Sequence, residues 1–159
     1  MELTRSSDLL TILPLDRQRY VVEFACRGLV RTTGGEVKTA ERFAAGILFS
    51  PDHLRKVEPL QVVRWFGPVN VWHPNIRPEL GAVCVGRMRP GVGLVELVYQ
   101  LFEMITWRRA SLADALNPEA AQWARNHWDR RPVEERGLRR GTRPKVSLRF
   151  SHAPGRGAE

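Results

Sequence analysis

Alternating apolar and polar residues divide the first half of the chain into short extended segments. The pattern predicts β-strands over residues 19–30, 41–49 and 60–66, which are rich in β-branched and aromatic residues and bounded by Gly and Pro. Residues 7–13 are predicted to form a short helix that is capped by serine and ended by Pro14. We therefore expect an antiparallel meander of three or four strands.

A long segment without periodicity separates these strands from two predicted helices. Residues 71–90 carry Pro, Gly and Asn at short intervals, which predicts a structured loop, and loops of this length are usually functional. Helical spacing then predicts a helix that packs on the sheet. Its apolar face consists of Leu94, Leu97, Val98, Leu101, Phe102 and Ile105.

A second helix is predicted to begin at Asn117-Pro118-Glu119 and to continue until Pro132. Asn is a favoured N-cap, Pro suits the first helical position, and Glu is favourable in the first turn. Strands followed by a loop and then by helices indicate an α+β domain, which we place at residues 1–136.

The composition is that of a globular protein with one buried core. Hydrophobic residues make up 43% of the 159 residues, charged residues make up 26%, and the apolar runs are too short to span a bilayer. The N-terminal residues lack the charged-then-apolar pattern of a signal peptide. We therefore expect a cytoplasmic protein without membrane contacts.

The net charge of +8 is concentrated near the C-terminus. Residues 136–159 contain seven basic residues and one acid, so this segment carries +6 of the total. Residues 137–159 are predicted to form a basic, largely flexible tail, in which only residues 146–150 have a strand-like pattern. A nucleic acid is the less favoured partner, because the domain itself lacks interleaved aromatic and basic residues.

The two cysteines, Cys26 and Cys84, do not form a metal or disulfide framework. Neither lies in a Cys-x-x-Cys pair, and the four histidines show no ligand spacing. We therefore expect no metal and no cofactor. Cys26 lies in a strand-like stretch and is predicted to be a small buried hydrophobic residue.

The most informative segment is residues 72–85, which read Trp-His-Pro-Asn-Ile-Arg-Pro-Glu-Leu-Gly-Ala-Val-Cys-Val. A Cys after a Gly-containing turn is weak evidence alone, and so is His-Pro-Asn. Their combination, after a strand meander and before an amphipathic helix, is more specific. It makes Cys84 a candidate nucleophile.

At these residues the chain resembles the ubiquitin-conjugating enzyme family. The family pattern is His-Pro-Asn-Ile, a short turn, Gly, an apolar residue and the acceptor cysteine. It matches His73, Asn75, Gly81 and Cys84, with one more residue between Asn75 and Cys84 than in the commonest members. Residues 114–121 resemble the segment that opens the family's helix beside the active site. The resemblance covers residues 19–128 and implies the ubiquitin-conjugating-type fold.

The resemblance also implies a function and roles for four residues. Cys84 would accept a ubiquitin-like protein from an activating enzyme as a thioester and transfer it to an amine of a protein substrate. Asn75 would support the oxyanion step by donating to the oxyanion or by holding the loop, and His73 would shape the turn. Asp114 matches the family's acidic gate residue, which orients the incoming lysine or accepts its proton.

The chain departs from the common family pattern at several places. Val85 and Gly86 replace the usual Leu-Asp, and the loop that docks many members to RING ligases is replaced by residues 88–92. These departures fit the divergent bacterial branch, which residues 116–123 resemble. Members of that branch are typically encoded with a ubiquitin-like protein, an activating enzyme and an isopeptidase-type protease, often in phage defence.

Three other functions remain open at this point. The chain is also compatible with a non-catalytic ubiquitin-like-binding variant, although such variants normally lose the cysteine that is present here. A nucleic-acid-binding protein would act through the basic tail. A cysteine hydrolase built from Cys84 and His73 would need the histidine within hydrogen-bond reach of the sulfur and a third group to orient it.

Overall fold

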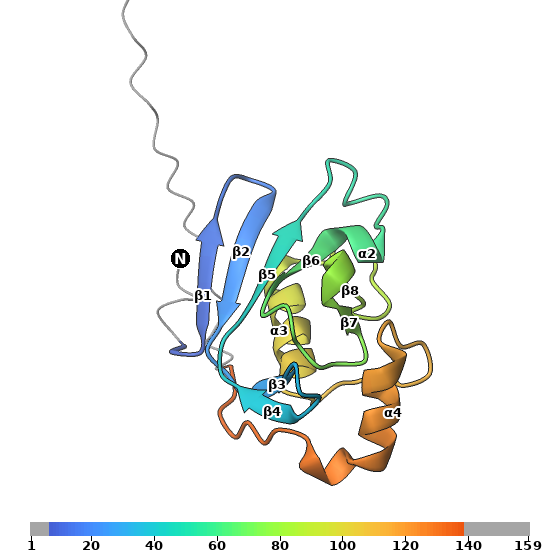
Figure 1. The fold of residues 1–159 in the computed structure, drawn as a ribbon. Helices are drawn as coiled ribbons and strands as arrows, with labels where there is room; N and C mark the ends of the chain where they lie inside the picture. The colour runs from blue at the N-terminus through green and yellow to red at the C-terminus, as the bar shows by residue number, and fades with distance from the viewer. Residues whose placement is uncertain (1–6, 139–159) are drawn as a thin grey trace, which may run out of the picture.

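The computed structural model describes residues 7–138 and has a six-stranded antiparallel sheet at its centre (Figure 1). The spatial order of the strands is β1 (Leu10–Pro14), β2 (Arg19–Phe24), β5 (Phe43–Leu48), β6 (Val63–Gly67), β8 (Ala82–Val83) and β7 (Ile76–Arg77). A separate hairpin consists of β3 (Gly28–Arg31) and β4 (Val37–Ala40). The α+β class predicted from the sequence is confirmed.

The helix α3 (Leu94–Ile105) packs against one face of the sheet (Figure 1). Its buried residues are Leu97, Val98, Leu101, Phe102, Met104 and Ile105, and Leu94 packs on their cluster. The predicted apolar face of this helix is therefore confirmed. The remaining helical elements are the single-turn α2 (Pro59–Val62), α4 (Pro118–Asn126) and the 3-10 turns η1 (Pro78–Leu80) and η2 (Trp128–Arg130). None of the helices in residues 7–138 is long and apolar enough to cross a bilayer.

The sequence-based prediction is wrong for the first element. Residues 7–13 do not form a helix, because Leu10 to Pro14 pair with β2 as an edge strand, with Leu10 opposite Phe24 and Ile12 opposite Val22. Leu10 and Ile12 are buried and the intervening Thr11 is exposed, which is the period of a strand with one face on the core. A short apolar run is ambiguous until a pairing partner is known.

Two other predicted boundaries are also corrected. The single strand expected at residues 19–30 is two strands, because the chain leaves the main sheet after Phe24 and begins the separate hairpin at Gly28. The long loop expected at residues 71–90 contains β7, η1 and β8. Its backbone is therefore partly paired and held in place by the sheet.

The start of α4 has the predicted cap. The side-chain Oδ1 of Asn117 accepts a hydrogen bond of 3.0 Å from the N–H of Ala120, and Pro118 is the first helical residue. The helix ends at Asn126, before the predicted stop at Pro132. A second apolar cluster joins α4 to the β3–β4 hairpin and to the segment before β7, and its buried members are Leu29, Trp72, Trp107, Ala120 and Ala124.

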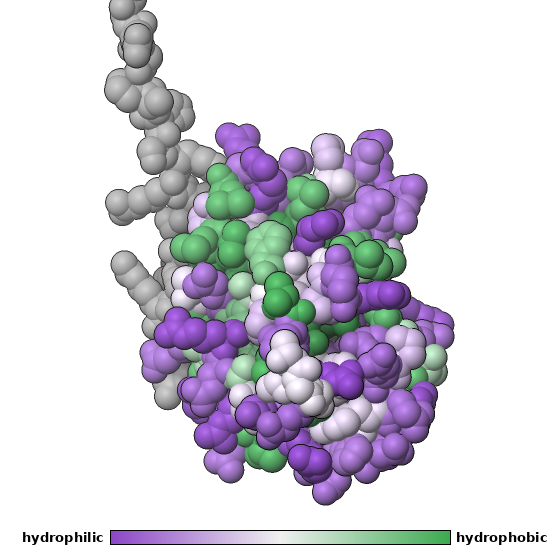
Figure 2. All heavy atoms as spheres, in the orientation of Figure 1, coloured by the Kyte–Doolittle hydropathy of each residue, from purple (hydrophilic) through white to green (hydrophobic). Residues whose placement is uncertain are grey.

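The face of the sheet opposite α3 carries exposed apolar side chains. Leu13, Leu48 and Phe66 alternate along their strands with residues that are buried on the α3 side. Figure 2 shows apolar side chains gathered over β1, β2 and β5, with polar ones around α4 and the β3–β4 hairpin.

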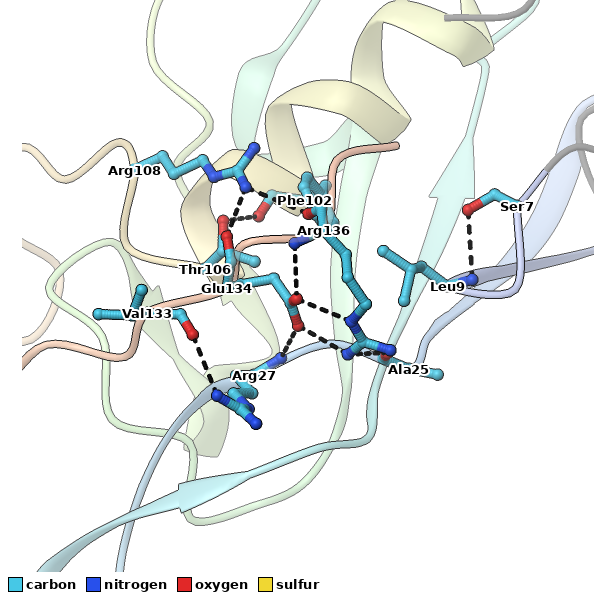
Figure 3. A network of polar contacts seen from close by, with 10 residues as sticks. All are labelled: Ser7, Leu9, Ala25, Arg27, Phe102, Thr106, Arg108, Val133, Glu134 and Arg136. Atoms are coloured by element: carbon cyan, nitrogen blue, oxygen red, sulfur yellow. Dashed lines mark hydrogen bonds and ion pairs between the residues drawn. The ribbon is translucent and has the colours of Figure 1, made fainter. Parts of the chain in front are cut away.

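Glu134, Arg136 and Leu138, called the C-terminal anchor below, join the end of the described chain to the domain. Figure 3 shows the polar contacts of Glu134 and Arg136. The buried Glu134 carboxylate accepts hydrogen bonds from Arg136 Nε at 2.8 Å and from the N–H of Arg27 at 2.9 Å. The Arg108 guanidinium donates to the carbonyls of Glu134 and Arg136. The side-chain hydrogen bond from Arg136 is the main reason why the pKa of Glu134 falls to about 2. Leu138 joins the main apolar core.

The rest of the predicted basic tail, with the strand-like residues 146–150, lies outside the described residues, as do residues 1–6.

Candidate active site

Cys84 follows β8 at the end of a short, closed loop. Its N–H donates a hydrogen bond of 2.9 Å to the carbonyl of Asn75, and β7 pairs with β8 between these two residues. The turn between the two strands passes through Gly81, whose φ of +62° suits glycine. Val83 and Val85 are buried while Cys84 is partly exposed, so the thiol-bearing residue lies on the outward side of the segment.

The side chain of Asn75 ties this loop to the segment that follows α3. Asn75 is 3% exposed, its Nδ2 donates to the carbonyl of Ser111 at 3.1 Å, and its Oδ1 accepts from the N–H of Ser111 at 2.8 Å. Both polar atoms of the amide are therefore paired, in the manner of a main-chain strand contact. The pair fixes the position of the loop that carries Cys84.

His73 is buried and organises the turn before Asn75. Its Nδ1 accepts a hydrogen bond of 3.1 Å from the N–H of Asn75, and its ring lies edge-on to that of Trp107 at 4.9 Å between centroids. Burial lowers the pKa of His73 to about 3, against a smaller opposing effect of the main chain of Arg109. The ring is neutral at ordinary pH, and the lone pair of Nδ1 is already occupied. This arrangement supports a positioning role and not the general-base role that a cysteine hydrolase needs.

Asp114 is exposed on the segment between α3 and α4. That segment is tied to the His73–Asn75 turn at two points: Ser111 bonds to Asn75, and the N–H of Asn117 donates to the carbonyl of Pro74 at 2.9 Å. Asp114 lies between Ser111 and Asn117, the two residues that form these hydrogen bonds. The structure therefore brings all four predicted site residues into two segments that are hydrogen-bonded to each other.

Sequence reasoning did not identify Ser111 or Arg109 as part of this region. The Arg109 guanidinium lies beside Gly86, where an added Cβ would be 2.9 Å from one of its terminal nitrogens. Gly86 also has a φ of +93°, so the backbone and the close approach both favour glycine there. The only signal in the sequence was Gly86, at a position where the ubiquitin-conjugating pattern that the chain resembles has an acid. Nothing in the spacing predicted which distant side chain would fill the space.

A polar groove of about 550 Å³ lies beside the loop from His73 to Cys84, called the site loop below. It is bounded by the β3–β4 hairpin, the strand-to-loop segment 69–72, residues 77–79 and the start of α4. Within it, the Arg31 guanidinium lies 4.7 Å from the ring centroid of Trp72 and 2.6 Å from the carboxylate of Glu119. The charge of Arg31 is therefore paired with that of Glu119.

Among residues 7–138, no three His, Cys, Asp or Glu side chains gather closely enough to hold a metal ion. In comparisons with known proteins, no protein-family model matches the chain and no curated protein matches it. The function is therefore inferred from the geometry around Cys84 together with the motif that surrounds it.

Proposed function

We propose that the protein is a ubiquitin-conjugating-type enzyme that carries a ubiquitin-like protein as a thioester on Cys84. The observation that supports this most strongly is that hydrogen bonds join the two motif segments. The main chain of Cys84 is hydrogen-bonded to that of Asn75, and the side chain of Asn75 is hydrogen-bonded to the main chain of Ser111. The order of the elements, with antiparallel strands before the site loop and helices after it, supports the ubiquitin-conjugating-type fold.

The first step is an exchange between two thioesters. The sulfur of Cys84 attacks the thioester carbonyl held by an activating enzyme, a new C–S bond forms, and the bond to the activating enzyme's cysteine breaks. The departing thiolate takes up the proton that Cys84 loses. Such an exchange needs an accessible thiol more than a strong base. A partly exposed Cys84 and a buried, neutral His73 meet that requirement.

The second step transfers the acyl group to an amine of a protein substrate. The amine nitrogen attacks the carbonyl, an oxyanion develops, and the C–S bond to Cys84 breaks to release the thiolate. Asn75 supports this step by holding the loop rigid, and its amide has one further N–H beyond the bond to Ser111. In the proposed mechanism, the exposed carboxylate of Asp114 orients the incoming amine or accepts its proton.

We extend the proposal to a cytoplasmic bacterial conjugation pathway, with defence against phage as the expected setting. The support is the resemblance of residues 116–123 to the bacterial branch and the absence from this sequence of the usual ligase-docking loop. The partners would be a ubiquitin-like protein, an activating enzyme and a protein substrate.

The proposal is tested by incubating the protein with ATP, an activating enzyme and the cognate ubiquitin-like protein. A reducible adduct is expected with wild type and with Cys26→Ser. No adduct is expected with Cys84→Ala, and Cys84→Ser should form an ester that resists dithiothreitol. If wild type and Cys84→Ala behave alike, the proposal is wrong. Binding of the ubiquitin-like protein without any adduct would instead indicate the non-catalytic variant of the fold.

A further inference from the structure

The surface next to Cys84 is positively charged. In the segment after β8, Val83 and Val85 are buried, whereas Cys84 and Gly86 are both partly exposed. Gly86 is two residues after Cys84, and consecutive Cα atoms are about 3.8 Å apart, so the two Cα atoms lie within about 7.6 Å of each other. The guanidinium of Arg109, which lies against Gly86, is therefore near Cys84.

A second uncompensated guanidinium belongs to Arg87, which follows Gly86 and is exposed. Among residues 7–138, neither Arg87 nor Arg109 forms an ion pair. Arg89 differs from them, because Glu96 lies 3.4 Å from its guanidinium. The adjoining segment between α3 and α4 contributes one carboxylate, that of Asp114. Two guanidiniums against one carboxylate leave an excess of positive charge beside the nucleophile.

We infer that the acyl donor of this enzyme carries carboxylate side chains close to its C-terminus, and that Arg87 and Arg109 recognise them. This inference rests on the proposed thioester function. When the terminal carbonyl is bonded to sulfur, the preceding two to four residues of an extended donor lie within about 7–13 Å of Cys84. Arginine pairs with carboxylates through two parallel hydrogen bonds, whereas a basic donor segment would be repelled.

The inference can be tested without the natural partners by using short peptide thioesters. The probes are Leu-X-Leu-X-Gly-Gly peptides with an acetylated N-terminus and a 2-mercaptoethanesulfonate thioester, where X is Glu, Gln or Arg. Attack by Cys84 forms the protein thioester and releases the small thiol, and intact-mass spectrometry measures the initial rate. At about 50 mM salt, where screening is weak, we expect the Glu peptide to react about tenfold faster than the Arg peptide, with the Gln peptide between them.

Matched variants identify the source of the preference. Replacing both guanidiniums, in Arg87→Gln with Arg109→Gln, should bring the Glu-to-Arg rate ratio close to one, whereas Arg109→Lys should retain part of it. Arg42→Gln is the control, because Arg42 is exposed just before β5, at the Phe24 and Phe43 end of the sheet. That variant should keep the full preference.

Two other outcomes have distinct meanings. Equal rates for the three peptides, or a faster reaction of the Arg peptide, would overturn the inference and leave the thioester function intact. If no peptide forms an adduct while iodoacetamide still alkylates Cys84, the inference is overturned, and charging from the activating enzyme decides separately whether the thioester function also fails.

Discussion

The regions around Cys26 and Cys84 use the same residue type in opposite ways. Cys26 is fully buried in the main core, where burial and, to a lesser extent, the negative charge of Glu134 raise its pKa to about 12. Cys84 is partly exposed at the end of a loop whose ends are joined by hydrogen bonds. The comparison shows that burial and polar surroundings, and not the presence of a thiol, separate an inert cysteine from a candidate nucleophile.

The polar groups that hold the two regions together also differ. Near Cys26, the C-terminal anchor uses a buried carboxylate and guanidinium groups to join distant parts of the chain. Near Cys84, the neutral amide of Asn75 bonds to main-chain groups of Ser111 and joins two segments that are distant in sequence. The neutral amide of Asn75 holds the loop without adding a fixed charge beside the thiol, and within residues 7–138 neither Arg87 nor Arg109 forms an ion pair.

The largest contrast is expected in thiol reactivity. At about pH 8, a thiol with a pKa near 12 is ionised to roughly one part in 10⁴, and burial also blocks access to it. We expect iodoacetamide to label Cys84 at least ~10³-fold faster than Cys26 in the native protein. Peptide mapping after timed alkylation measures both rates. Cys84→Ser should leave the native protein almost unlabelled, and urea should make Cys26 reactive; fast labelling of native Cys26 would contradict the comparison.

Asn75→Ala is expected to produce the next largest effect. It removes two partly buried hydrogen bonds and leaves the Ser111 main-chain groups without their partner, which should lower the free energy of unfolding by about 2 kcal/mol. Urea denaturation measures the loss. In the conjugation assay, the variant should still be charged at Cys84 but should discharge to lysine more slowly. Unchanged discharge would remove Asn75 from the transfer step.

Glu134→Gln tests the C-terminal anchor and should lower the free energy of unfolding by about 2 kcal/mol at neutral pH, because it weakens charge-assisted hydrogen bonds. The pKa of Glu134 falls from 4.5 to about 2 on folding. Its contribution to stability is therefore complete above about pH 4.5 and is lost as the pH falls through 2.

The difference in unfolding free energy between wild type and Glu134→Gln should accordingly shrink between about pH 4.5 and pH 2. Urea denaturation at several pH values follows this difference, and charging of Cys84 at neutral pH should not change in the variant. A difference that stays constant as the solution is acidified would show that the carboxylate does not carry the effect.

Asp114→Asn should have the smallest effect on stability, within about 0.5 kcal/mol, because the side chain is exposed. Transfer to lysine should nevertheless slow by about tenfold or more if the carboxylate orients or deprotonates the amine. Single-turnover discharge assays measure this rate. Glu79 is also an exposed acid, but it lies in the turn between β7 and β8, so Glu79→Gln is the control and should discharge at the wild-type rate.

Local patterns predicted α3 and the start of α4 well and the first elements of the chain less well. The spacing from Leu94 to Ile105 and the cap at Asn117 depend on interactions within one or two helical turns, so both could be predicted. The first strand was mistaken for a helix, because its extended form depends on pairing with β2. The break between Phe24 and Gly28 also depended on which strands the following residues join.

The sequence by itself determined the α+β class, the amphipathic helix and the motif that singles out Cys84, Asn75, His73 and Asp114. Only the tertiary structure decided how the residues around the thiol are arranged: the amide of Asn75 bonds to a residue 36 positions away, and Arg109 occupies the space beside Gly86. The physical reason is that these contacts join segments that come together only when the core packs. Their geometry is therefore a property of the folded chain, whereas the spacing of a helix face is already present in the sequence.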